Sequence, residues 1–194
     1  MSEKAKRDIA ATKKSLAAAA KELMTACGNC DEVTSRRIAA RADVNPAMIN
    51  YCFGSREALL YEVYRSMLGE AQQNSPGLKR LMEADISPKE KLILLHINMM
   101  RLMLAGFSYS QAMTKYILLN RSGDMGMESL SFIRDHFNGH KTEEECRLIA
   151  FQLTSLNELA VLRHEMFRTE LGIDLTDDVQ LESFVRSNAE RFLG

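Results

Sequence analysis

Apolar residues recur at intervals of three and four positions along most of this chain, and no stretch of five or more residues alternates between apolar and polar. The first spacing places side chains on one face of an α-helix, whereas alternation would place them on one face of a strand. Only 3 prolines and 10 glycines occur in 194 residues, so few positions interrupt a helix. The sequence therefore predicts an all-α fold.

Interruptions of this spacing predict where the helices begin and end. Gly28, the segment 43–45 and Gly54 separate four helices in the first third of the chain, and the clearest later break is Asn74 to Gly77. We place a domain boundary between that break and Pro88. The predicted helices span about Lys6–Cys27, Arg36–Ala42, Pro46–Phe53, Glu57–Leu68, Lys89–Ala105, Ser110–Leu119, Met125–Phe137, Thr142–Leu171 and Thr176–Leu193.

A net charge of −1, if evenly spread, argues against a nucleic-acid partner, but the charge is unevenly distributed. Residues 1–65 hold 11 Lys and Arg against 8 Asp and Glu, a net of +3, and residues 66–194 hold 14 against 18, a net of −4. A basic N-terminal third suits contact with DNA phosphates, although a difference of this size also arises by chance.

Hydropathy and cysteine content predict the compartment. No apolar run approaches the roughly 18 residues of a membrane span, and no apolar segment typical of a signal peptide follows the basic start. Four cysteines in a chain of this length indicate reduced thiols more than a disulfide framework. We expect a cytoplasmic protein with no membrane partner.

Two short predicted helices joined by a turn of three or four residues lie between two longer ones, which is the layout of a helix-turn-helix. The second short helix must enter a major groove about 12 Å wide, with small or polar residues at its start. Four such residues stand there: Asn45, Pro46, Ala47 and Met48. The apolar residues expected to hold the two helices together are Ile38, Ala39, Ala42, Val44, Ile49 and Phe53.

The run TSRRIAARADVNPAMINYCFGSREALL, from Thr34 to Leu60, resembles the N-terminal signature of the tetracycline-repressor (TetR/AcrR) family of bacterial transcription regulators. The resemblance implies three groups of DNA contacts. Phosphates are contacted at the start of the first short helix, with help from the helix dipole, by Thr34, Ser35 and Arg36. Bases are faced by Asn45, Pro46, Ala47, Met48 and Asn50. The DNA backbone is held by Tyr51 and Arg56.

The chain departs from the family pattern at three positions. Asp43 stands where a glycine is usual; it tolerates a left-handed backbone but places a negative charge near DNA. Asn50 and Cys52 replace a tyrosine and a histidine. Asn50 either pairs with adenine or only caps or fills space.

The resemblance also divides the chain by function. Residues 1–54 form a three-helix DNA-binding domain with the helix-turn-helix, residues 55–74 a connecting helix, and residues 75–194 a larger helical domain that binds a ligand and dimerises. Thioether side chains suit a pocket that adapts to varied ligands, but they are also ordinary core residues. The candidate ligand-binding residues are His96, Met99, Met100, Arg101, Met103, Met113 and Tyr116. An inward Arg101 would need an anionic partner, either a ligand or Glu158.

The helix predicted over Thr142–Leu171 is about 45 Å long at about 1.5 Å per residue, and its apolar positions occupy more than one face. The last helix shows the same feature, and such helices need two sets of partners. In the resembled family the last two long helices form a four-helix dimer interface. A homodimer would also place two recognition helices one DNA turn apart, about 34–36 Å, on a palindromic operator.

Metal and catalytic motifs are weak. Cys27 and Cys30 form a C-x-x-C pair without a second pair at matching spacing, so two incidental thiols are expected rather than a zinc or redox site. No nucleophile elbow or phosphate-binding glycine loop occurs, and we expect neither an enzyme nor a cofactor or metal.

These observations predict a sequence-specific transcriptional regulator, a repressor that an unidentified small molecule releases from DNA. The alternative is an all-helical ligand-binding or protein-interaction module that does not bind DNA. The dependence of binding on salt would discriminate the two.

Overall fold

The computed structural model describes residues 3–73, 83–120 and 127–194, and every regular element in these ranges is a helix. The described residues fall into two compact units: those up to Gln73 together with Lys115–Leu119, and the remainder. The all-α prediction is confirmed for this part of the chain. The break predicted at Asn74 to Gly77 and the helix start predicted at Met125 lie outside the described residues.

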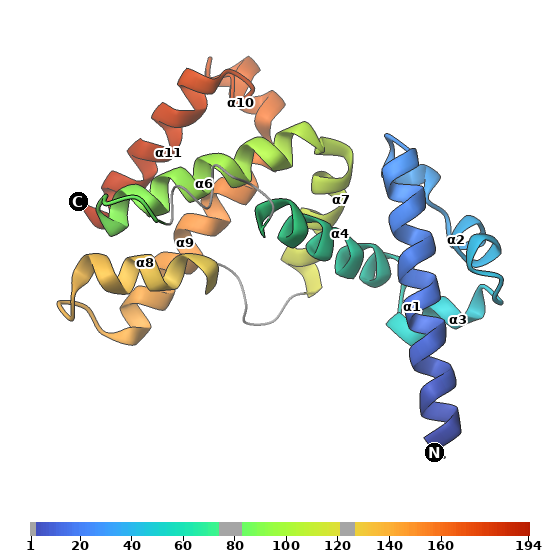
Figure 1. The fold of residues 1–194 in the computed structure, drawn as a ribbon. Coiled ribbons are helices and arrows are strands. Elements are labelled where there is room, and N and C mark those ends of the chain that lie inside the picture. The colour runs from blue at the N-terminus through green and yellow to red at the C-terminus, as the bar shows by residue number, and fades with distance from the viewer. Residues whose placement is uncertain (1–2, 74–82, 121–126) are drawn as a thin grey trace. The chain divides into compact units, whose positions relative to one another are not determined.

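The first unit contains four α-helices and a short 3-10 turn. They are α1 (Glu3–Ala26), η1 (Cys30–Glu32), α2 (Ser35–Ala42), α3 (Ala47–Phe53) and α4 (Arg56–Gln73). Figure 1 shows α2 and α3 beside α1, and α1 packs against α2, α3 and α4. The fully buried side chains at the centre of this unit are Leu16, Val33, Ile38, Ile49, Leu59 and Leu60.

The second unit is built around α6 (Pro88–Ala105), which packs against three other helices. These are α8 (Met127–Phe137), α9 (Glu143–Leu162) and α11 (Asp178–Leu193), and two further helices are α7 (Phe107–Asn120) and α10 (His164–Glu170). Figure 1 shows α6 between α8 and α11. The core contains large side chains from each of the four packed helices, among them Leu92, Ile93, Met100, Leu130, Ile133, Leu153, Leu181 and Val185.

Most helix ends lie within a few residues of the predicted ones. α6 begins at Pro88, because Ser87 caps it by accepting a hydrogen bond from the Glu90 N–H at 3.2 Å. α7 begins at Phe107 instead of Ser110, because the Gly106 carbonyl already accepts hydrogen bonds from Tyr109 and Ser110.

The single helix predicted over Thr142–Leu171 is wrong. The chain leaves helical geometry at Arg163 (φ −110°, ψ 20°), which separates α9 from α10. The ring of His164 lies edge-on to Phe107, with ring centroids 4.3 Å apart, and its Nδ1 is 3.1 Å from the Val161 carbonyl. Contacts with a helix distant in sequence therefore break α9, where no glycine or proline marks the site.

No single helix in the described ranges is long and apolar enough to cross a membrane, whereas α6 and α7 pass that test of length and composition only as a pair bent by 112°.

Candidate functional site

The turn between α2 and α3 has four residues, 43–46, one more than the predicted segment 43–45, because α3 begins at Ala47. Thr34 caps α2 by accepting a hydrogen bond from the Arg37 N–H at 3.3 Å. Asp43 ends α2 in the left-handed conformation (φ 54°, ψ 46°), and its N–H reaches the Ala40 carbonyl. The expectation that Asp43 replaces a glycine in a left-handed turn is confirmed, and this turn redirects the chain into α3.

The start of α3 is fixed by its own side chains. Asn45 Oδ1 accepts a hydrogen bond from the Ala47 N–H at 2.8 Å, and Pro46 precedes the first helical residue in helical geometry. At the other end Gly54 has φ 82°, which favours glycine, and Ser55 caps α4 by accepting from the Ala58 N–H at 3.0 Å. Asn45 thus orients the helix that carries the predicted base-contacting residues.

The side chains of α3 divide between the core and the exposed surface. Ile49 and Cys52 are buried, whereas Ala47, Asn50 and Tyr51 are exposed and lie at i, i+3 and i+4 on one face. Tyr51 is 63% exposed, which is high for an aromatic residue. Cys52 therefore belongs to the core in this chain, and Asn50 to the exposed face. Of the other predicted base-facing residues, Asn45 and Pro46 are exposed and Met48 is half-buried.

The predicted phosphate contacts cluster at the start of α2. Thr34 and Arg36 are exposed, and Ser35 is half-buried. Arg36 forms no ion pair with any residue that the structure describes, whereas Arg37 donates to the Glu32 carbonyl at 2.8 Å and Arg41 pairs with Glu22 at 2.6 Å. Arg36 is thus the arginine of α2 whose charge is not already compensated by a neighbour.

Arg56 is directed toward the protein. Its Nε donates to the Val33 carbonyl at 2.6 Å, and its Nη2 donates to the Cys30 carbonyl at 2.5 Å. Nη1 donates to Glu57 at 3.0 Å, so three of the five N–H groups of the guanidinium have protein acceptors. These bonds join the start of α4 to the η1 turn, a bracing role that the sequence did not indicate. The phosphate contact expected of Arg56 stays a prediction.

A sequence model described as bacterial regulatory proteins of the tetR family matches residues 16–63. The match begins within α1 and ends within α4, so it contains the whole helix-turn-helix. Residues 16–63 therefore form a DNA-binding domain of the TetR type. The chain is a TetR-type transcriptional regulator with a helix-turn-helix DNA-binding domain and a larger C-terminal helical region. No curated protein matches the sequence.

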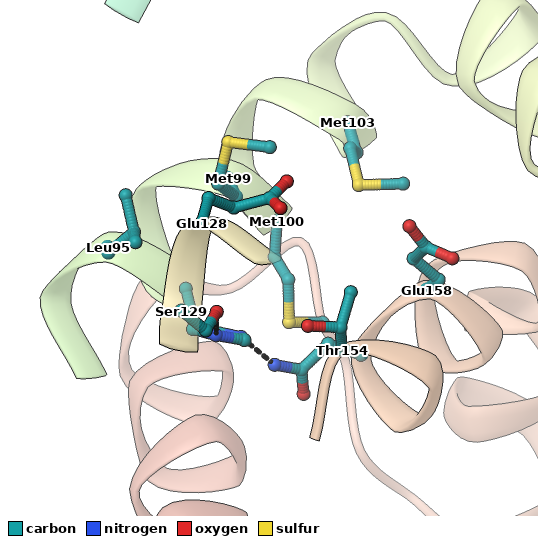
Figure 2. Close-up of a pocket in the computed structure, with 10 residues that line it drawn as sticks. Leu95, Met99, Met100, Met103, Glu128, Ser129, Thr154 and Glu158 are labelled. Carbon is teal, nitrogen blue, oxygen red and sulfur yellow. Dashed lines mark hydrogen bonds between the residues drawn. The ribbon is translucent and has the colours of Figure 1, made fainter. Parts of the chain in front are cut away.

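The second unit of the chain contains a small cavity of about 50 Å³ between α6, α8 and α9 (Figure 2). Pockets that enclose a drug-sized molecule measure roughly 300–1,000 Å³, so the present space fits only a small chemical group. Figure 2 shows Met103 on α6 and Glu158 on α9 on opposite sides of it. The lining residues are Leu95, His96, Met99, Met100, Met103, Glu128, Ser129, Thr154, Asn157 and Glu158.

His96 is buried at the edge of this cavity. Its Nδ1 lies 2.5 Å from Asn157 Nδ2 and its Nε2 lies 2.8 Å from Ser129 Oγ. Because the amide nitrogen is a donor, Nδ1 accepts and Nε2 carries the proton that is donated to Ser129. Burial lowers the pKa of His96 to about 4, so the ring is neutral at pH 7.

The cavity includes four of the seven residues predicted to bind a ligand: His96, Met99, Met100 and Met103. The other three do not line it. Arg101 is exposed and pairs with Asp178 at 2.7 Å, so its side chain does not point into the cavity. Met113 is buried, and the ring of Tyr116 packs at a tilt of 38° against Tyr61 within the first unit, with ring centroids 5.3 Å apart.

Six lining residues were not predicted, although the sequence pattern around three of them could have indicated the site. Ser129, Thr154 and Asn157 are polar residues inside the apolar spacing of their helices, which is the pattern that singled out His96. No sequence pattern distinguished Leu95 or Glu128, and Glu158 was considered only as a partner for Arg101.

All four cysteines are buried thiols. Burial raises the pKa of the Cys30 thiol, which opposes formation of the reactive thiolate. In the ranges that the structure describes, no three His, Cys, Asp or Glu side chains are grouped so that they could hold a metal ion.

Proposed function

We propose that this TetR-family regulator is a homodimeric repressor that binds a palindromic operator and is released by a small molecule. In this proposal residues 1–54 bind DNA, residues 55–74 connect the two parts, and residues 75–194 bind the effector and dimerise. The exposed face of α3 is the observation that carries it, because this face presents Ala47, Asn50 and Tyr51 from a helix held at both ends by caps.

The proposed DNA contacts combine this face with the start of α2. Thr34, Ser35 and Arg36 donate to phosphates, and Arg36 brings a charge that no described partner neutralises. Tyr51 donates to the DNA backbone, while Asn45, Pro46, Ala47, Met48 and Asn50 lie against bases. We leave Arg56 out of this set, because its bonds to Cys30 and Val33 already position it as a brace.

Homodimerisation is supported by the exposed face of α9. Four large apolar side chains of this helix are between 39% and 55% exposed, and all of them except Leu156 lie on the face opposite its buried residues. They are Leu148, Phe151, Leu156 and Leu159. Val179 on α11 is 76% exposed, and Ser183 and Ser187 on the same helix are small enough for close approach. Exposed apolar side chains of this kind favour an interface, and a second copy of α9 and α11 would supply a matching surface.

Release by an effector requires a ligand that binds the two states of the protein with different affinity. The cavity between α6, α8 and α9 supports this part of the proposal, because a molecule too large for its space of about 50 Å³ would displace these helices on entering fully. Such a displacement would change the separation of the two DNA-binding domains and lower the affinity for the operator.

Footprinting on the DNA upstream of the gene for this protein tests DNA binding. The expected result is a protected palindrome whose affinity falls steeply between about 50 and 200 mM salt, because several phosphates release counterions. Absence of protection at every salt concentration would contradict DNA binding and support the protein-interaction alternative.

Sedimentation velocity on Phe151→Asp tests the dimer. A buried charge in the interface should shift the protein to monomer, whereas Leu119→Asp introduces the same charge at a residue that is 83% exposed elsewhere and should leave the dimer intact. Equal behaviour of the two variants would rule out this surface as the interface.

A further inference from the structure

The cavity wall formed by α9 presents oxygen atoms. Thr154, Asn157 and Glu158 lie at i, i+3 and i+4 and therefore on one side of the helix, and all three line the cavity. Thr154 Oγ1 and Asn157 Oδ1 are buried and have no hydrogen-bond partner among the described residues. Asn157 is only 4% exposed, and its amide nitrogen is already engaged by His96. The amide oxygen therefore needs a donor that the described residues do not supply.

The lining carries negative charge only. Glu128 and Glu158 contribute two carboxylates, and none of the ten lining residues is Lys or Arg. The nearest arginine on α6 in sequence, Arg101, is exposed and paired with Asp178. His96 adds no positive charge at pH 7, because burial keeps its pKa near 4. A cation is attracted to this lining, and an anion is repelled.

Apart from His96, the cavity wall on α6 is apolar. Leu95, Met99 and Met103 lie along one face of α6, and Figure 2 shows the thioether of Met103 across the cavity from Glu158. Thioether side chains are flexible, so this wall can move to admit an apolar group. The existing space of about 50 Å³ is sufficient for an ammonium group, which is little larger than a water molecule.

We propose that the effector is a small organic cation, an alkyl or aryl amine, whose N–H groups donate to Thr154, Asn157 and Glu158 while its apolar body lies against Met99 and Met103. This inference rests on the proposed function, since it names the chemical class of the effector in the same cavity. A primary amine resembles a lysine side chain, so it is charged at pH 7. Its three N–H donors match the three oxygen groups on α9 in number.

Isothermal calorimetry on the full-length protein at pH 7 with hexylamine, 1-hexanol and hexanoate tests the proposal, because these probes share one apolar chain and differ in charge. Hexylamine should bind saturably and more tightly than the other two by about tenfold, since a charge-assisted hydrogen bond is stronger than a neutral one. Equal or tighter binding of hexanol or hexanoate would overturn the proposal. So would the absence of saturable binding across the amines from butylamine to decylamine.

Two variants locate the amine. Glu158→Gln keeps the size of the side chain and removes its charge, and should weaken hexylamine binding about tenfold while leaving hexanol unaffected. Thr154→Val removes the unpartnered hydroxyl and should weaken hexylamine binding severalfold. Glu144→Gln, an exposed position in the first turn of the same helix, is the matched control and should change nothing. An unchanged affinity in both Glu158→Gln and Thr154→Val would place the amine elsewhere.

Footprinting in the presence of the probes separates this inference from the proposed function. If the protein protects its operator but amines fail to bind, the repressor proposal stands and the proposal of an amine effector is wrong. If no operator is protected but hexylamine binds and depends on Glu158, the cavity chemistry stands and the regulatory role fails.

Discussion

Asn157 donates a hydrogen bond from its amide nitrogen to Nδ1 of His96 across 2.5 Å. The bond leaves the imidazole proton on Nε2, where Ser129 Oγ accepts it at 2.8 Å. Both ring nitrogens are thus engaged in the neutral state, and a second proton would meet the amide hydrogens of Asn157. Burial acts in the same direction, and the pKa of His96 falls from its ordinary 6.5 to about 4.

Stability should therefore decrease with acidity in a definite window. Below pH 6.5 the unfolded chain protonates His96 and the folded chain does not, so the free energy of unfolding falls as the pH drops toward about 4. The free energy of unfolding decreases by roughly 3 kcal/mol in total between pH 6.5 and about 4, and above pH 6.5 His96 causes no decrease. His96→Gln removes this contribution, so the difference in unfolding free energy between wild type and variant should change across that window in urea titrations.

His140→Gln is the control for this experiment, because His140 is exposed. Its unfolding free energy at pH 7 should stay within about 0.5 kcal/mol of the wild type. Parallel curves for wild type and His96→Gln would contradict the assigned pKa.

Local signals made the helix-turn-helix predictable. Thr34 caps α2, Asp43 adopts the left-handed turn, and Gly54 ends α3, each through its own backbone or side chain within a few residues. Alternation of buried and exposed positions on α3 also follows from a period of 3.6 residues. These features depend on residues that are close in the sequence, so they can be predicted from one sequence alone.

The second unit was less predictable, because its features depend on contacts between distant segments. Arg101 is directed to the surface by Asp178, which lies 77 positions away. The break at Arg163 follows from packing of His164 on Phe107. The cavity is lined by residues of α6, α8 and α9 together. The spacing of residues within α6 could therefore predict only the lining residues that belong to α6.

Tyr51 and Asn50 should have different effects on DNA binding. Tyr51→Ala should weaken binding to every sequence by roughly 1–3 kcal/mol, because a phosphate contact carries no sequence information. Asn50→Ala should cost a similar amount on the preferred operator and remove discrimination at one base pair. Gel-shift titration against a set of operator variants measures both. An equal loss on all variants for Asn50→Ala would exclude a base contact and favour a spacing role.

Asp43 should limit both stability and DNA affinity. Its left-handed backbone (φ 54°) costs a non-glycine residue about 1 kcal/mol, so Asp43→Gly should raise the free energy of unfolding by that amount. Asp43→Asn removes only the charge, and should tighten DNA binding at low salt with little change in stability. Asn138→Gly is the matched control, since Asn138 has φ 45° in the second unit and should gain stability without a change in DNA affinity. Weaker DNA binding by Asp43→Asn would show that the carboxylate assists recognition.

Substitution of Arg56 should affect mainly stability, whereas substitution of Arg36 should affect mainly DNA binding. Arg56→Met removes the donors to the Cys30 and Val33 carbonyls, and should lower the free energy of unfolding by roughly 1–3 kcal/mol in urea titrations. Arg36→Met should leave stability within about 0.5 kcal/mol, because Arg36 is exposed and unpaired among the described residues. It should instead reduce the slope of log affinity against log salt by about 1 per protomer, the effect of one lost phosphate contact. An Arg56→Met variant with unchanged stability but a smaller slope of log affinity against log salt would contradict the structural role. It would show that the guanidinium of Arg56 contacts a phosphate.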